Sequence, residues 1–173
     1  QYVLPYYDFS KNFFDNNNFV SFNFLSQGDN ILKDTNSLRS RMINNIKIQS
    51  YDYFSEIGFK NNFNYHFKNT ISAGKNNVEY DSSPHVKLMN VFEFTSSFPL
   101  YNIGENYIDN LNPKISLRIN PSDMKTYKNE IRQINNDNIF DIDRLGLIDT
   151  LESGKSLTLG VDYKKEEIEN INK

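Results

Sequence analysis

The stretch that decides the fold is PHVKLMNVFEFTSSFPLYNIGENYIDNLNPKISLRIN, residues 84–120. From Val86 to Leu100 the even positions are mostly apolar and the odd positions mostly polar, and the alternation returns from Lys114 to Ile119. A period of two residues is the pattern of a β-strand with one apolar and one polar face. Gly104 lies between the two runs and allows a tight reversal of the chain. The stretch therefore predicts a β-hairpin.

The same alternation recurs along the rest of the chain and predicts five further strands. These are Val3–Phe9, Val20–Phe24, Leu38–Gln49, Phe59–Asn69 and Ser156–Tyr163. With the hairpin they predict an all-β fold, an antiparallel meander of about seven strands with almost no helix. Most of these strands exceed the roughly five to six residues typical of soluble proteins. They match the roughly nine to eleven residues of a tilted strand that crosses a membrane.

Composition limits the class of protein. The chain has 173 residues, a net charge of -3, 14% aromatic residues and no cysteine. This length suits one domain, and the absence of cysteine excludes disulfides and thiolate metal sites within these residues. The chain has no run of about 18 apolar residues, so no transmembrane helix is predicted. It also has no N-terminal basic-plus-apolar segment of the kind that predicts a signal peptide. Because the chain opens at Gln1 directly in a strand-like run, we expect it to be an interior piece of a longer protein.

The predicted connections are of two kinds. The short ones are rich in aromatic residues and comprise Lys11–Asn18, Ser50–Glu56 and Tyr101–Tyr107. The longer ones are polar and comprise Ser26–Thr35, Ala73–Ser83 and Pro121–Ser153. Short turns at one end and long loops at the other are typical of outer-membrane barrels, with aromatic residues at the membrane interfaces. We therefore expect the short turns to be periplasmic and the long loops to be extracellular.

A resemblance to a known family sharpens this interpretation. The chain resembles the C-terminal barrel of the LPS-assembly protein (LptD) family, the outer-membrane lipopolysaccharide translocon. The residues that carry the resemblance are Leu4-Pro5, Ser97–Leu100, Asn112-Pro113, Asn138–Arg144, Gly146–Gly154 and the strand Ser156–Tyr163. Together they extend over nearly the whole chain.

The most specific part of the resemblance lies before the last predicted strand. Family members often have a run of the form Arg-aromatic-Ser-Gly-x-Asp-Arg-x-Glu-x-Gly there. Thr150 stands where an Arg is usual and Leu147 replaces the usual Gly, so no role of that Arg is carried over. The positions that fit the family run are Arg144, Asp149, Glu152 and Gly154.

The resemblance implies transport without bond chemistry, so we expect neither an enzyme nor a cofactor. Residues 1–173 would be a partial outer-membrane β-barrel domain from the middle of the barrel wall, in the outer membrane of a Gram-negative bacterium. The N-terminal jellyroll and the lateral-gate strands would lie outside it. The implied partners are lipopolysaccharide, outer-membrane lipids, a plug lipoprotein of the LptE kind and, through the jellyroll, a periplasmic bridge of the LptA kind. No nucleic acid partner is expected.

Basic side chains accumulate on the predicted polar faces of the strands, although the chain as a whole is slightly acidic. In a barrel this face lines the lumen, where cations can hold anionic groups of a saccharide through charge-assisted hydrogen bonds. A competing interpretation is that these cations cover a wet surface and pair with acids elsewhere. The residues predicted to guide the substrate are Arg39, Arg41, Lys47, Lys60, Lys68, Lys87, Lys114 and Arg118.

Two further groups of residues have side chains that could bind a metal ion or transfer a proton. Oxygen ligands suit a divalent cation, but a solvated extracellular loop is the simpler interpretation of the acidic cluster Asp141, Asp143, Asp149 and Glu152. His66 and His85 have no ligand spacing around them, and His66 is predicted to be a residue of the polar face. We therefore expect no metal site and no catalytic residue.

Two other hypotheses remain open from the sequence. Another outer-membrane barrel, such as a porin or a TonB-dependent receptor, would share the alternation and the loop asymmetry. A soluble β-sandwich that serves as an adhesion or binding module also alternates, but its apolar faces would have to meet one another.

Overall fold

The computed structural model describes residues 2–3, 5–14, 19–33, 36–77, 80–123 and 133–167. These residues form ten β-strands and no helix, all in one antiparallel sheet. Within the same ranges there is no helix of the length and hydropathy that a membrane crossing requires. The strands are β1 (Tyr2–Val3), β2 (Tyr7–Phe14), β3 (Val20–Lys33), β4 (Ser37–Ser50), β5 (Tyr53–Phe54), β6 (Lys60–Lys75), β7 (His85–Ser97), β8 (Leu100–Ile103), β9 (Tyr107–Asn120) and β10 (Gly154–Glu167).

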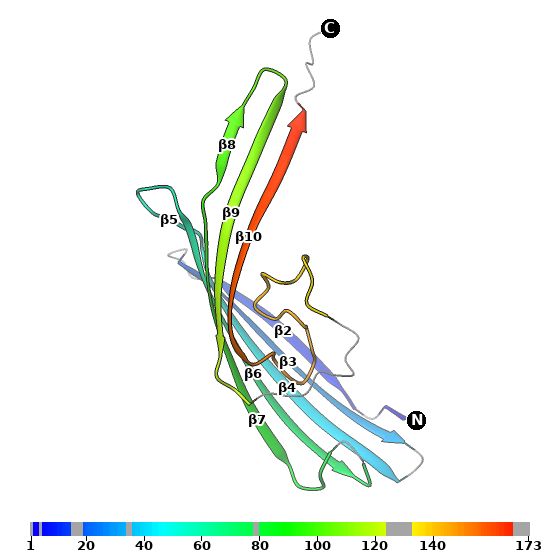
Figure 1. Ribbon diagram of the computed structural model, residues 1–173. Coiled ribbons are helices and arrows are strands. Elements are labelled where there is room, and N and C mark those ends of the chain that lie inside the picture. The colour runs from blue at the N-terminus through cyan, green and yellow to red at the C-terminus, as the bar shows by residue number, and fades with distance from the viewer. Residues whose placement is uncertain are drawn as a thin grey trace.

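The ten strands lie in seven rows. Strands β1 and β2 both pair with β3, β4 and β5 both pair with β6, and β7 and β8 both pair with β9. The remaining rows are β3, β6, β9 and β10, and neighbours in the chain are neighbours in the sheet (Figure 1). The prediction of an all-β antiparallel meander is confirmed. The sheet is open, with β1 and β2 at one edge and β10 at the other.

Proline explains two of the breaks within rows, because it has no amide hydrogen to donate to the ladder. Pro99 separates β7 from β8, yet both strands keep one continuous register on β9. Pro5 lies between β1 and β2, where Val3 pairs with Ile31 and Tyr7 with Gly28. One extra residue is accommodated there, so the alternation predicted from Val3 to Phe9 is interrupted.

The strands are longer than the sequence pattern indicated. Ser26–Thr35 was predicted as a loop, and this is wrong because β3 continues through it to Lys33. Gly28, Asp29 and Asn30 are poor strand formers on their own, but each pairs with a residue of β4. The predicted loop Ala73–Ser83 likewise begins inside β6, which ends at Lys75.

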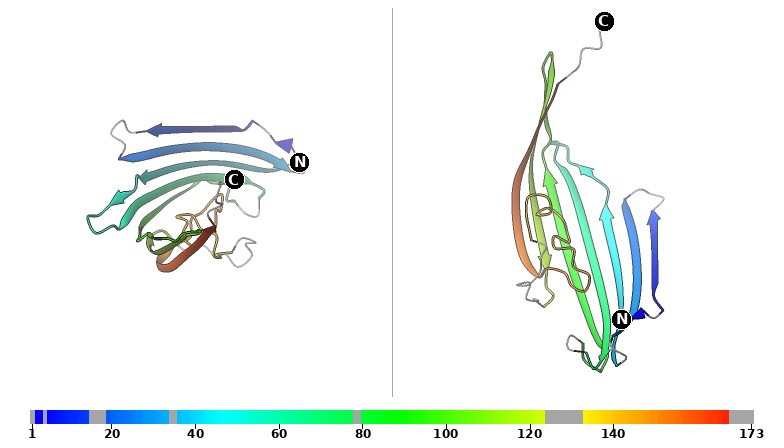
Figure 2. Two further views of the ribbon diagram at one scale, coloured as in Figure 1. Left: turned by 90° about the horizontal axis from the view of Figure 1, so that it is seen from above. Right: turned by 90° about the vertical axis from the view of Figure 1, so that its right-hand side faces the viewer.

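The two faces of the sheet differ in curvature and in polarity. The sheet bends around the segment 133–153, which lies on its concave side (Figure 2). The convex face carries exposed apolar side chains, such as Phe63 at 59% and Leu159 at 72% exposure. The concave face instead buries polar and charged side chains, with His66 and Lys68 among them. From β3 onward the alternation therefore predicted correctly which residues of the predicted strands share a face.

The segment 133–153, called the inner loop from here on, packs against the concave face. Its Leu151 is fully buried and forms a small apolar cluster with Met89 and Val91 of β7, against which Ile142 also packs. Its Arg144 is also buried. The interpretation of the inner loop as solvated is therefore wrong, while its extracellular position stays a prediction. The residues between Asp123 and the inner loop lie outside the described part of the chain.

Candidate functional site

The concave face holds all eight predicted substrate-guiding cations. The strand register decides this, since Lys47 lies opposite His66, Lys87 opposite Thr70 and Arg118 opposite Glu93. Residues two apart in a strand share a face, and the same parity includes the remaining five. These are Arg39, Arg41, Lys60, Lys68 and Lys114.

Six of these eight cations have an acidic partner in the described part of the chain. The ion pairs are Arg39–Asp29 at 3.1 Å, Arg41–Asp29 at 2.5 Å, Lys60–Asp52 at 2.9 Å, Lys68–Asp143 at 3.6 Å, Lys114–Asp162 at 2.7 Å and Arg118–Glu152 at 3.8 Å. The face is therefore largely charge-compensated rather than strongly basic. The sequence pattern does not reveal Asp29, because it lies in a predicted loop, or the roles of Asp143 and Glu152, because it predicts a solvated loop there.

Lys68 is the first anchor of the inner loop. Its side chain projects from the middle of β6 and the residue is only 3% exposed. The Nζ atom donates hydrogen bonds to the carbonyl oxygens of Leu147 at 2.6 Å and Thr150 at 3.1 Å. With Asp143 at 3.6 Å, it has three oxygen partners. A buried ammonium needs such partners, because an unpaired buried charge is costly.

Arg118 of β9 is the second anchor and is 2% exposed. Its Nε donates to the carbonyl oxygen of Ile142 at 2.9 Å, and its Nη2 donates to that of Glu152 at 2.7 Å. Asn120 donates to the same Glu152 carbonyl oxygen at 2.7 Å. Hydrogen bonds to a charged donor contribute roughly 1.5–3 kcal/mol each. The inner loop is thus held by its backbone oxygens.

The four residues that fit the family run have different surroundings. The guanidinium of Arg144 donates two hydrogen bonds to the carboxylate of Glu152, from Nε to Oε2 at 2.8 Å and from Nη2 to Oε1 at 2.6 Å. This fork-to-fork geometry is among the strongest side-chain contacts. Gly154 begins β10 with a φ of +101°, a backbone conformation that favours glycine. Asp149 borders a cavity described below.

Two other ionisable residues of the concave face are buried among polar partners. Glu93 accepts hydrogen bonds from Asn64 at 3.0 Å and Ser116 at 3.1 Å. His66 lies 3.0 Å from Asn45, measured from Nε2 to Oδ1. His66 thus lies on the polar face as predicted, beside the side-chain amide of Asn45.

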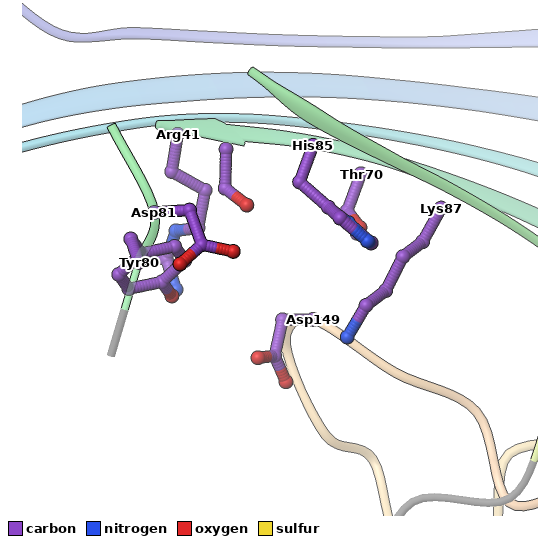
Figure 3. A pocket seen from close by; sticks show the side chains of 8 residues that line it. Arg41, Thr70, Tyr80, Asp81, His85, Lys87 and Asp149 are labelled. Atoms are coloured by element: carbon purple, nitrogen blue, oxygen red, sulfur yellow. The ribbon is translucent and has the colours of Figure 1, made fainter. Parts of the chain in front are cut away.

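A cavity of about 520 Å³ lies between the inner loop and the wall. Arg41, Thr70, Ser72, His85 and Lys87 line it from the wall, and Asp149 lines it from the inner loop (Figure 3). The connection between β6 and β7 adds Tyr80 and Asp81. Donors, acceptors and both signs of charge thus meet in one space, whose volume lies within the usual range for small-ligand sites.

The acidic cluster of the inner loop does not gather into one site. Asp143 forms an ion pair with Lys68, and Glu152 forms ion pairs with Arg118 and Arg144. Asp143 also accepts a hydrogen bond from the amide of Gly146 at 3.0 Å. Over the described ranges, no group of three or more histidine, cysteine or acidic side chains is placed to hold a metal ion.

Comparison with protein-family models, with curated proteins and with solved structures gives no match to this chain.

Proposed function

We propose that this chain forms part of the wall of a large outer-membrane β-barrel that exports lipopolysaccharide. The observation that carries the proposal is the polarity of the two faces. The convex face exposes large apolar side chains along the four adjacent rows β6, β7, β9 and β10, among them Phe63, Phe92, Leu117 and Leu159, and also at Phe9 of the edge strand β2. A soluble protein rarely leaves so large an apolar surface in contact with water, whereas a barrel in lipid has an apolar outside and a polar inside.

The alternative of a soluble β-sandwich receives less support. A sandwich buries its apolar faces against a second sheet, and the described strands all belong to one sheet. Each large apolar side chain gains roughly 1.5–3 kcal/mol by leaving water, and in this fold the lipid would supply that gain. The open edges at β2 and β10 would pair with further strands, because an unpaired edge in lipid leaves backbone groups without partners.

Lipopolysaccharide as the transported substrate is supported by the family resemblance and by the chemistry of the concave face. In a barrel this face would line the lumen. Because six of its eight cations are paired with acids, net positive charge would contribute little to guiding the substrate. Hydrogen bonds from paired cations, amides and hydroxyls would hold saccharide groups weakly enough to release them. The same proposal includes two protein partners, a plug lipoprotein inside the barrel and a periplasmic bridge that delivers lipopolysaccharide.

The lipid-facing part of the proposal can be tested with single cysteines, since the chain has none of its own. The full-length protein carrying Phe63→Cys or Leu117→Cys is reconstituted in liposomes and treated with a membrane-impermeant maleimide. Both thiols are expected to stay unlabelled, whereas a matched Lys47→Cys on the exposed part of the concave face is labelled. Rapid labelling of all three thiols would contradict a lipid-facing convex surface.

The substrate can be tested by photo-crosslinking during export in cells. Crosslinkers at Lys60 and Lys87 on the concave face are expected to capture lipopolysaccharide, and those at Phe63 and Leu117 are not. Capture at neither concave position in a barrel that passes the thiol test would point to a different cargo.

A further inference from the structure

We propose that the inner loop is a displaceable cover, and that Lys68 and Arg118 beneath it bind an anionic group of a ligand once the cover lifts. The inference rests on the proposed function, because the loop can leave the wall only if the concave face borders a water-filled lumen. Three features of the described residues support it: the polarity of the contact, the internal cohesion of the loop, and the arrangement of its ends.

The contact between the loop and the wall is mainly polar. Lys68 and Arg118 hold the loop by hydrogen bonds to backbone carbonyl oxygens rather than by burial in an apolar core. The apolar part of the contact centres on Leu151 against Met89 and Val91 and on the Phe140 ring, which lies over Lys114 and Gly160. Hydrogen bonds of this kind can be exchanged for bonds to water or to a ligand when the surface opens.

The loop also has contacts of its own that would survive displacement. Arg144 and Glu152 form their ion pair entirely within it, and Asp143 accepts a hydrogen bond from the amide of Gly146. Asn138 closes a further turn, since its Oδ1 accepts from the amide of Asn135 at 2.9 Å. The loop can therefore move as one body, with little loss of its internal hydrogen bonds.

The ends of the loop allow such a movement without disturbing the sheet. Gly154 pairs with Asn120, so β9 and β10 remain joined right up to the point where the chain leaves them. Gly154 has a φ of +101°, and a Cβ atom added there would meet no other atom within 4 Å. This open, conformationally free position is suited to act as the hinge.

The oxygens of the loop occupy the positions that an anion would take. Lys68 donates hydrogen bonds to the carbonyl oxygens of Leu147 and Thr150. Arg118 donates to those of Ile142 and Glu152. Phosphate or carboxylate oxygens would replace them with stronger, charge-assisted bonds. Since Asp149 of the loop also borders the cavity, displacement would join that cavity to the newly exposed cations.

A thiol under the loop reports displacement. Val91 is fully buried beneath Leu151, so Val91→Cys should react with a maleimide only when the loop lifts. The full-length protein in liposomes is labelled at about 0.05 M and about 1 M NaCl, because chloride can bind Lys68 and Arg118 only after the loop lifts and so shifts the equilibrium towards the open form. We expect the labelling rate of Cys at position 91 to rise at least about tenfold, with less than about twofold change for Lys47→Cys.

Two reference samples give the labelling rate of a fully exposed thiol at position 91. A variant in which an Asn-Gly turn replaces residues 121–153 should label at the open rate, since Asn120 and Gly154 are already paired. Should that variant fail to fold, the urea-unfolded Val91→Cys protein gives the same upper limit. Pyrophosphate at matched ionic strength is the anionic probe, and we expect it to open the loop several-fold more than NaCl does. Lys68→Gln should remove that difference.

A thiol at position 91 that stays protected at all salt and pyrophosphate concentrations would show that the inner loop is a fixed part of the wall. Equal effects of NaCl and pyrophosphate at one ionic strength would rule out the anion site. Failure of the proposed function looks different, because Phe63→Cys would then be labelled in the same liposomes whether or not the loop moves.

Discussion

Glu152→Gln should loosen the inner loop more than any change at an exposed ion pair of the same sheet. The carboxylate of Glu152 receives both ends of the Arg144 guanidinium, at 2.8 and 2.6 Å, and lies 3.8 Å from Arg118. The substitution keeps the size of the side chain and leaves the Glu152 carbonyl oxygen bound to Arg118 and Asn120. It removes the negative charge alone.

The expected magnitude follows from burial. Arg144 is buried, and removing one partner of a buried ion pair typically costs 3–5 kcal/mol. Glutamine retains one acceptor oxygen for the guanidinium, which places the loss near the lower end, at about 3 kcal/mol. At 1.36 kcal/mol for each tenfold change, this corresponds to a roughly 150-fold larger population of molecules in which the inner loop is locally unfolded around Arg144.

Trypsin cleavage after Arg144 measures that population, because cleavage requires the arginine to leave its buried position and its rate follows the fraction of open molecules. The bond is followed by mass spectrometry on the reconstituted protein. Asp162→Asn is the matched control, since it removes an equally short ion pair with Lys114, at 2.7 Å, from a side chain that is 60% exposed. Such pairs contribute at most about 1 kcal/mol, so the control should change cleavage by less than about fivefold. Equal cleavage rates in both variants would refute the role given to the Arg144–Glu152 contact.

Three further outcomes are expected. Gly160→Val should displace Phe140, whose ring would lie 2.7 Å from an added Cβ, and the resulting mobility of the loop is detected as faster hydrogen exchange around Phe140; unchanged exchange there would contradict the contact. Leu151→Ala should lower the free energy of unfolding by about 2–5 kcal/mol through the cavity it leaves, measured by urea titration in micelles, whereas Leu157→Ala on the exposed convex face should cost far less; equal losses would mean that Leu151 is not part of a core. Finally, the isolated chain should not form a stable monomer in detergent-free buffer, because its apolar convex face and both sheet edges lack partners; a single cooperative unfolding transition of a monomer, confirmed by sedimentation, would disprove this.

The sequence was sufficient to predict where the main strands lie, though not their full length, and which residues share a face from β3 onward. Alternation is a local property with a period of two, so the pattern around Phe63 or Leu117 needs no knowledge of distant residues. Where local preference and pairing disagree, the prediction failed: Asp29 looked like part of a loop but lies inside β3, because β4 pairs with it.

The tertiary structure decided which face is covered and by what. Ile43, Met89 and Val91 break the alternation by placing apolar side chains on the polar face, and all three are buried. For the last two the reason is Leu151, which lies 60 or more positions further along the chain and packs on them. The carbonyl partners of Lys68 and Arg118, Leu147 and Ile142, lie 79 and 24 positions further along the chain. Contacts between such remote segments depend on how a loop folds back onto a sheet, and no local periodicity encodes that.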